Sequence, residues 1–196
     1  MPTSTEDVYR QAARMIAQGR RVELSSLGEA LHISRTTLFR KAGTRERIMG
    51  EALWWQANES LTRAEARWRR AYGSAVRDHT GTLRCVRILT DHGSATAADA
   101  GIRHLLDEEP ALATRVLTDP FGCVQPRVIA VARRLFEADA SDADLRMLVD
   151  VDSLCYAVVR LGESFLYADQ LANRRPDIDA ANTLVAALIQ GVLQPR

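Results

Sequence analysis

The sequence predicts an all-α protein with a small N-terminal head and a larger helical body. The 196 residues include only 11 Gly and 6 Pro, which is few for a loop-rich β fold. Apolar residues recur at helical spacing along most of the chain. No stretch shows strict two-residue alternation between turn residues, so we expect no sheet.

Capping residues and apolar spacing together predict four helices near the N-terminus, over residues 6–18, 24–31, 35–41 and 44–72. Thr5 is the expected cap of the first helix, which Gly19 ends. Ser34 is a good N-cap for the third helix, and Thr44 caps the fourth. The fourth helix meets no breaker before Gly73, so it is long enough to join two domains.

Breaks rich in Gly, Pro and Asp separate six further predicted helices, over residues 80–92, 95–108, 111–118, 124–139, 142–169 and 176–193. We place the domain boundary at residue 50. Residues 1–50 carry nine basic and five acidic side chains, a net charge of +4, whereas residues 73–196 carry thirteen and seventeen, a net charge of −4. A basic head on an acidic body indicates an anionic partner at one end only.

Several classes of function lack their signature residues. Lys41 is the one lysine, and the residues before it do not form a phosphate-binding Gly-rich loop. Cys85, Cys123 and Cys155 are far apart and lack a Cys-x-x-Cys pair, which indicates reduced thiols rather than disulfides or a zinc site. No signal segment or membrane span is expected, since even the uncharged run 180–195 is too short. We therefore expect a cytoplasmic protein with no catalytic residues, metal or cofactor.

The segment over residues 24–41 has the pattern of a helix-turn-helix. Its apolar residues predict a small core that sets the crossing angle of the two helices: Leu27, Leu31, Ile33 and Leu38. Gly28 lets the helices approach closely. The third helix then presents a polar face of Arg35, Thr36, Thr37, Arg40 and Lys41. Such a face suits the major groove of DNA, although these residues alone are equally compatible with a solvated basic helix.

The stretch over residues 27–49, LGEALHISRTTLFRKAGTRERIM, resembles the tetracycline-repressor (TetR) family of bacterial transcription regulators. The likeness extends over about residues 6–53 and consists of an apolar–small pair, a turn ending in Ser, a Thr-Leu-aromatic recognition helix and the opening of the fourth helix. The Arg-rich Thr-Thr-Leu-Phe-Arg run is similar to the quorum-signal-degradation (QsdR-like) branch. The resemblance implies a set of DNA-contacting residues: Ser34, Arg35, Thr36, Thr37, Phe39, Arg40, Lys41 and Arg45.

Four positions depart from the family pattern. His32 replaces the usual turn glycine, and His is among the better non-glycine residues if the backbone there is left-handed. Phe39 replaces a tyrosine and so lacks its phosphate-binding hydroxyl, and Ala42 replaces an aromatic residue. Arg45 replaces a lysine and keeps the phosphate-contacting charge.

The family resemblance also implies the roles of the body. The last two helices, over residues 142–169 and 176–193, would pair with those of a second copy, and the apolar stripe of the last helix fits this role. The middle helices would surround an effector cavity within residues 83–166. Its candidate lining residues are Leu89, His92, His104, Phe121, Cys123, Cys155, Tyr156, Val159 and Glu163. Apolar walls and the negative charge of the body favour a small, largely apolar effector with one polar end, such as a lactone or acyl compound.

The leading hypothesis is a homodimeric repressor that an effector releases from a palindromic operator in double-stranded DNA. An all-helical enzyme is a second class, and the absence of any nucleophile, metal or cofactor signature disfavours it. A helical protein-interaction module, with the basic head docking to a protein partner, is the third.

Overall fold

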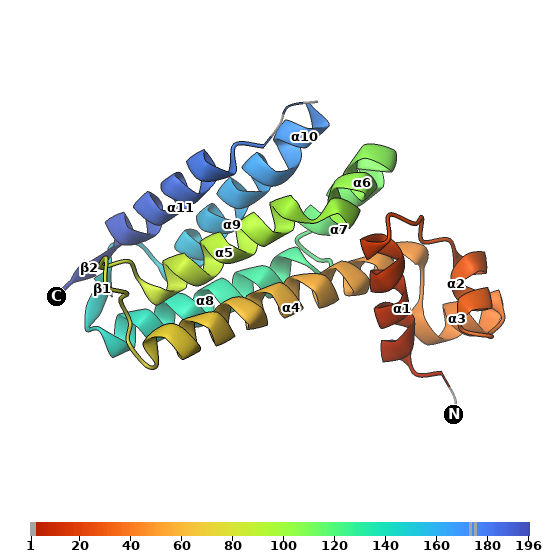
Figure 1. Cartoon of the computed structure of the whole chain (residues 1–196), viewed down its shortest axis with the longest axis horizontal. Coiled ribbons are helices and arrows are strands. Elements are labelled where there is room, and N and C mark those ends of the chain that lie inside the picture. The colour runs from red at the N-terminus through yellow and green to blue at the C-terminus, as the bar shows by residue number, and fades with distance from the viewer. Residues whose placement is uncertain (1–2, 173, 175) are drawn as a thin grey trace. The chain divides into compact units, whose positions relative to one another are not determined.

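The computed structural model describes residues 3–172, 174 and 176–196, and it confirms the all-α prediction (Figure 1). The α-helices are α1 (Thr5–Ala17), α2 (Leu24–Ala30), α3 (Arg35–Ala42), α4 (Arg45–Tyr72), α5 (Arg84–Ala98), α6 (Ala100–Glu108), α7 (Pro110–Thr118), α8 (Gln125–Asp142), α9 (Val151–Glu163), α10 (Asp169–Leu171) and α11 (Ile178–Val192). A π-helical segment, Ser164–Ala168, joins α9 to α10.

The chain forms two compact units. The head unit contains the chain up to Asn58 together with Asp99–Pro126, and the body unit contains Glu59–Ala98 and Arg127–Arg196. Helix α4 runs from the first unit into the second. The head unit is larger than the segment 1–50 expected from the sequence, because α6 and α7 pack with the N-terminal helices.

Helix α1 shows how local sequence sets the first element of the head unit. Ser4, not Thr5, is its N-cap, because the Ser4 hydroxyl accepts a hydrogen bond from the Asp7 backbone N–H while the Asp7 carboxylate accepts one from the Ser4 backbone. The buried face of α1 is apolar and includes Met15 and Ile16. Gly19 follows with a φ of 63°, and it ends the helix as predicted.

Helices α6 and α7 are fitted closely to the rest of the head unit. A Cβ atom at Gly101, near the start of α6, would lie 2.2 Å from the Ile16 carbonyl oxygen of α1, so a glycine is required there. On α4, a Cβ atom at Gly50 would lie 3.1 Å from Cys123 Cβ and 3.5 Å from Val116 of α7. These contacts leave little room for α6 or α7 to move within the unit.

The body unit packs around an apolar core that includes Trp68, Phe136 and Ile189, and α11 lies against α5 and α9 (Figure 1). Asp139 is fully buried in this core. Its carboxylate accepts hydrogen bonds from Arg84 Nε at 2.7 Å and from the Cys85 backbone N–H at 2.8 Å, which attaches the start of α5 to α8.

The body unit corrects two predictions. Strand β1 (Leu145–Met147) pairs antiparallel with β2 (Leu193–Pro195), although no sheet was expected. Three residues are too few to show a detectable alternation, and the pairing joins segments far apart in the sequence. The helix predicted over 142–169 is also wrong, because α9 begins only at Val151, where the Asp150 carboxylate caps it by accepting from the Ser153 N–H at 2.8 Å.

Candidate nucleic-acid interface

The turn between α2 and α3 has the geometry that the sequence predicts. The Ser34 hydroxyl accepts a hydrogen bond from the Thr37 backbone N–H at 3.1 Å, which caps α3. His32 has a φ of 54°, so the departure from the family's turn glycine is accommodated in the left-handed region. A Cβ atom at Gly28 would lie 2.8 Å from the Ile33 carbonyl oxygen, which explains why a glycine stands under the turn.

Helix α3 buries one face and exposes the other. Leu38 and Ala42 are buried in the head unit, and the side chains on the opposite face are exposed: Arg35, Thr36, Phe39, Arg40 and Lys41. Within the described residues, none of the three cations on this face forms an ion pair with a carboxylate. The face therefore offers unpaired positive charge, hydroxyl groups and an exposed aromatic ring on one short helix.

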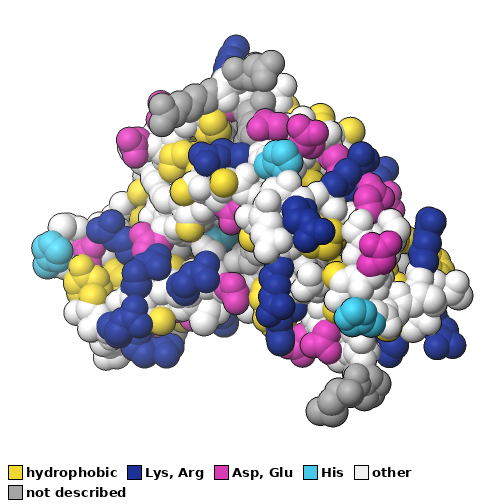
Figure 2. All heavy atoms as spheres, turned by 45° about the vertical axis from the view of Figure 1, so that its right-hand side comes forward, with side chains coloured by type: hydrophobic (Ala, Val, Ile, Leu, Met, Phe, Trp, Pro, Cys, Tyr) yellow, Lys and Arg dark blue, Asp and Glu magenta, His cyan; other side chains and the backbone are white. Residues whose placement is uncertain are grey.

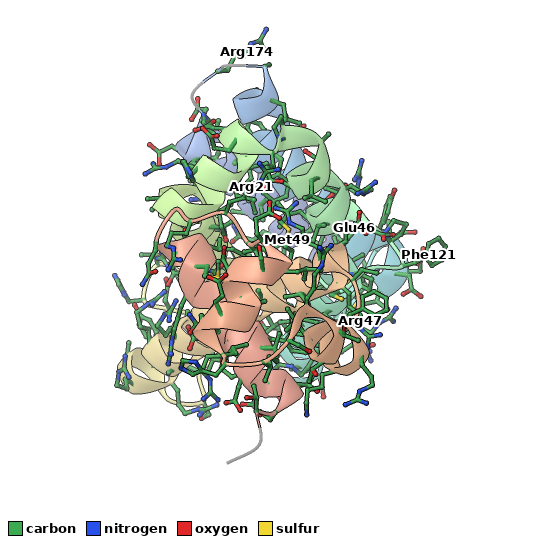
Figure 3. All side chains as sticks on the ribbon, turned by 90° about the vertical axis from the view of Figure 1, so that its right-hand side faces the viewer. Arg21, Glu46, Arg47, Met49, Phe121 and Arg174 are labelled. Atoms are coloured by element: carbon green, nitrogen blue, oxygen red, sulfur yellow. The ribbon has the colours of Figure 1, made fainter. Side chains whose placement is uncertain are left out.

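The other predicted DNA-contacting side chains differ in how free they are to reach DNA. Ser34 and Thr37 bond each other through their hydroxyl oxygens, 2.9 Å apart, so both side chains have local structural roles. Arg47, which the sequence analysis did not single out, is exposed in the first turn of α4, and Figure 3 shows it in the head unit with Glu46. Its backbone N–H donates to the Thr44 hydroxyl at 3.2 Å. The family motif points to the neighbouring Arg45, and no sequence signal distinguishes Arg47 from other surface arginines.

Arg45 is held by protein groups. Its Nε donates to the Val22 carbonyl oxygen at 2.5 Å, and its terminal nitrogens lie 2.8 and 2.6 Å from the two carboxylate oxygens of Glu109. The hydrogen bonds that Arg45 donates to the Glu109 carboxylate raise the pKa of the Arg45 guanidinium and lower the pKa of the Glu109 carboxyl. The Arg45 side chain is 21% exposed, at the edge of a shallow depression that Arg35 and Phe39 also line. Its contact with a phosphate stays a prediction.

Carboxylates accompany arginines elsewhere on the surface, and Figure 2 shows acidic and basic side chains mixed over much of the visible face. Examples are Arg115 with Glu46 at 2.5 Å and Arg67 with Asp91 at 2.9 Å. Exposed pairs of this kind contribute little stability. The α3 face differs from the rest of the surface in this respect, because its cations have no carboxylate partners among the described residues.

The structure divides the candidate effector residues between the two units. The body unit holds Leu89, His92, Cys155, Tyr156, Val159 and Glu163, and the head unit holds His104, Phe121 and Cys123. Leu89, Cys155 and Val159 are buried in the body unit. His104 borders a small pocket with Gly19 and Arg20, and Cys123 packs against Gly50, so both belong to the packing of the head unit.

Two members of this set do not line an enclosed site. Phe121 is 95% exposed, because it stands in a tight turn in which its N–H donates to the Asp119 carboxylate at 2.9 Å. Tyr156 is 56% exposed on the outer face of α9. Polar and apolar residues on the middle helices are compatible with a cavity wall, but residue type alone does not reveal on which side of an element a side chain lies.

His92 is the candidate with the clearest polar environment in the body unit. Its Nδ1 lies 3.2 Å from the Ser60 hydroxyl oxygen, and burial lowers the pKa of the imidazole to about 4. The ring is therefore neutral at physiological pH. Nearby on α5, the Ser94 hydroxyl accepts a hydrogen bond from the Asn182 amide of α11 at 2.9 Å. Glu163 has its carboxylate 2.8 Å from Arg160.

The described residues contain no cluster of three or more His, Cys, Asp or Glu side chains arranged to hold a metal ion. None of the described helices is long and apolar enough to cross a membrane. The three cysteines are free thiols in the structure; Cys85 and Cys155 are buried and Cys123 is partly buried.

Residues 80–190, more than half of the chain, match the family described as "Tetracyclin repressor-like, C-terminal domain". The chain belongs to the TetR family. This confirms the resemblance carried by the helix-turn-helix segment, and the match falls on the body rather than on the head. TetR-family proteins are ligand-responsive DNA-binding transcription regulators that act as dimers, not enzymes.

Solved structures of TetR-family repressors share the fold. The transcriptional repressor QsdR of R. erythropolis superposes with a TM-score of 0.80 at 20% identity, covering 98% of this chain and 96% of that one. AlkX of Dietzia sp. strain DQ12-45-1b, a repressor implicated in biodegradation of n-alkanes, has a TM-score of 0.59 at 17% identity, covering 98% and 100%. No curated protein sequence matches the chain significantly.

Proposed function

We propose that this TetR-family regulator is a repressor that binds a palindromic operator as a homodimer and leaves it when a small, largely apolar effector binds. The observation that carries the proposal is the exposed face of α3, where three cations without carboxylate partners among the described residues surround Thr36 and Phe39. A capped helix of this kind after a tight turn is the element that enters the major groove in helix-turn-helix proteins. As a bacterial transcription regulator that binds operator DNA, the protein would act in the cytoplasm.

Roles within the interface follow from side-chain chemistry. Arg40 can bond a guanine edge through two parallel hydrogen bonds, and Thr36 can contact a base or a thymine methyl. Lys41 and the exposed Arg47 are suited to neutralise phosphates. Phe39 is 56% exposed and offers only apolar contact, since it has no hydroxyl group.

The homodimer is supported by the outer surface of α11. Residues 180–195 contain no charged side chain, and Leu184 is nevertheless 47% exposed. An exposed uncharged helix face is typical of an interface between protein surfaces. Pairing by α9 and α11 across a twofold axis would match two recognition helices to a palindromic operator.

The effector class is supported by the polar groups inside the body unit. His92 with Ser60, and Asn182 with Ser94, are neutral hydrogen-bonding pairs beside an apolar core. Neutral groups of this kind orient a carbonyl, ester or amide without demanding a charge on the ligand. A lactone or acyl compound fits, in keeping with a QsdR-like branch and with the role of AlkX in n-alkane biodegradation.

Selection of binding sites from random duplex DNA, followed by gel-shift measurement, tests the operator proposal. Arg40→Ala should weaken binding to the selected site by about 1–3 kcal/mol and relax the preference at one base pair. Arg63→Ala is the control, because Arg63 is exposed on the body-unit part of α4. Equal binding by Arg40→Ala and the control would remove α3 from the groove. Failure to select any sequence would favour the protein-interaction alternative.

A panel of lactones, fatty acids and aromatic compounds tests the effector proposal. An effector must bind the DNA-free conformation more tightly, so one compound should both raise the melting temperature and release the operator. Hits found only among multiply charged compounds would contradict the neutral, largely apolar effector.

A further inference from the structure

Glu109 is a residue of the head unit that lies outside the helix-turn-helix in sequence. It stands between the last residue of α6 and the first residue of α7, directly before Pro110. Its side chain is only 9% exposed, which is unusual for a carboxylate on a helix corner. This burial requires partners that compensate for the lost hydration.

The partners of Glu109 belong to the N-terminal part of the head unit. Both carboxylate oxygens accept hydrogen bonds from Arg45, the first residue of α4, in a bidentate pair. Arg21, in the linker between α1 and α2, lies 3.2 Å away. Arg45 also donates to the Val22 carbonyl oxygen of the same linker. One carboxylate therefore connects the α6–α7 corner to the two segments that flank α2 and α3.

The α6–α7 corner is itself held in place. Gly101 packs against the backbone of Ile16, which attaches α6 to α1, and Val116 of α7 and Cys123 pack against Gly50, which attaches α7 and the residues after it to α4. A carboxylate on such a fixed corner defines a position for the Arg45 guanidinium. Removing its charge would leave a half-buried arginine without its main partner.

We propose that Glu109 is a positioning residue for operator recognition. By holding Arg45, it orients the start of α4 and the α1–α2 linker, and these segments determine how α3 is presented to the groove. Arg45 then acts by orientation, and phosphate neutralisation falls to Lys41 and Arg47. This inference rests on the proposed function and adds to it a determinant of DNA affinity outside the helix-turn-helix.

Glu109→Gln is the variant that removes the charge and keeps the shape. It should weaken binding to the selected operator about tenfold, while binding to a random duplex of equal length changes less than about twofold. The slope of log K against log salt concentration should stay unchanged, because no phosphate contact is lost. Glu46→Gln is the matched control: Glu46 also pairs with an arginine of the head unit, but its side chain is 52% exposed.

The exchange variant, Arg45→Glu with Glu109→Arg, separates positioning from phosphate contact. Positioning predicts that the exchange recovers much of the operator affinity lost in either single variant, because the pair is restored in reverse. If Glu109→Gln tightened binding to both duplexes and Arg45→Gln lowered the salt slope by about one, Arg45 would be a phosphate ligand that Glu109 restrains, and the proposal would be overturned.

Two other outcomes also decide the matter. A parallel loss on operator and random duplex, together with a lower melting temperature, would assign Glu109 a purely structural role and refute positioning. A wild-type protein that selects no DNA sequence would instead refute the proposed function itself. The wild-type selection therefore distinguishes the two failures.

Discussion

Gly101→Ala tests directly whether α6 belongs to the head unit through backbone contact. The added Cβ atom would lie 2.2 Å from the Ile16 carbonyl oxygen, 2.8 Å from its carbonyl carbon and 2.9 Å from Ala17 Cα. Close C–H···O contacts occur at about 3.3 Å or more, so α6 would have to move away from α1 by about 1 Å. The cap of α6 would survive, since Asp99 accepts from the Gly101 N–H, which alanine retains.

The expected loss follows from two opposing effects. Inserting one carbon into a closely packed contact costs about 1–3 kcal/mol, and more where the opposing atoms are backbone. Alanine has a higher helix propensity than glycine, which adds up to about 1 kcal/mol to the free energy of unfolding. We expect a net loss of about 2 kcal/mol in the free energy of unfolding, or about 4–8 °C in melting temperature for a chain of this length.

Gly93→Ala is the matched control. Gly93 lies inside α5, and a Cβ atom there would meet only Asn182 Oδ1, at an ordinary 3.7 Å. Without a clash, alanine should stabilise the protein by about 0.5–1 kcal/mol. The same substitution should therefore have opposite signs at the two positions.

Thermal and urea unfolding of both variants measure this difference, at one protein concentration because the stability of any oligomer depends on concentration. If Gly101→Ala is as stable as Gly93→Ala, the close packing of α6 on α1 is wrong. The rigid corner that positions Glu109 would then lose its support as well.

Two further predictions concern the body unit. Leu184→Asp should yield monomers that stay folded and bind operator weakly, because it places a charge on an exposed, uncharged helix face; sedimentation velocity measures this, and an unchanged dimer would exclude that face. The pKa of His92 is lowered to about 4 from 6.5, so the unfolded chain binds a proton at a higher pH than the folded chain does. The fold therefore has its full stability above pH 6.5 and loses stability as the pH falls towards 4. Wild type should lose about 2 kcal/mol between pH 7 and pH 5, and an equal loss in His92→Gln would show that another group is responsible.

The head could be predicted largely because its signals are local. Ser34 caps α3 through the backbone three residues on, His32 adopts the left-handed turn that its family position implies, and Gly28 lies against Ile33 five residues later. Each interaction joins neighbours in sequence, so residue type and spacing suffice to predict it. The cap of α1 was displaced by one residue, from Thr5 to Ser4, since both side chains are capable of capping.

The sequence by itself determined the all-α class, the capped helix α3 with its exposed cations, and the family. The tertiary structure alone decided that α6 and α7 belong to the head unit, that Glu109 holds Arg45 from 64 residues away, and that the candidate effector residues divide between two units. It also decided that Phe121 is exposed and that Leu145 pairs with Pro195. The physical reason is the same in each case. Side-chain burial and ion pairing depend on which distant segments pack together, and helical periodicity does not indicate which segments these are.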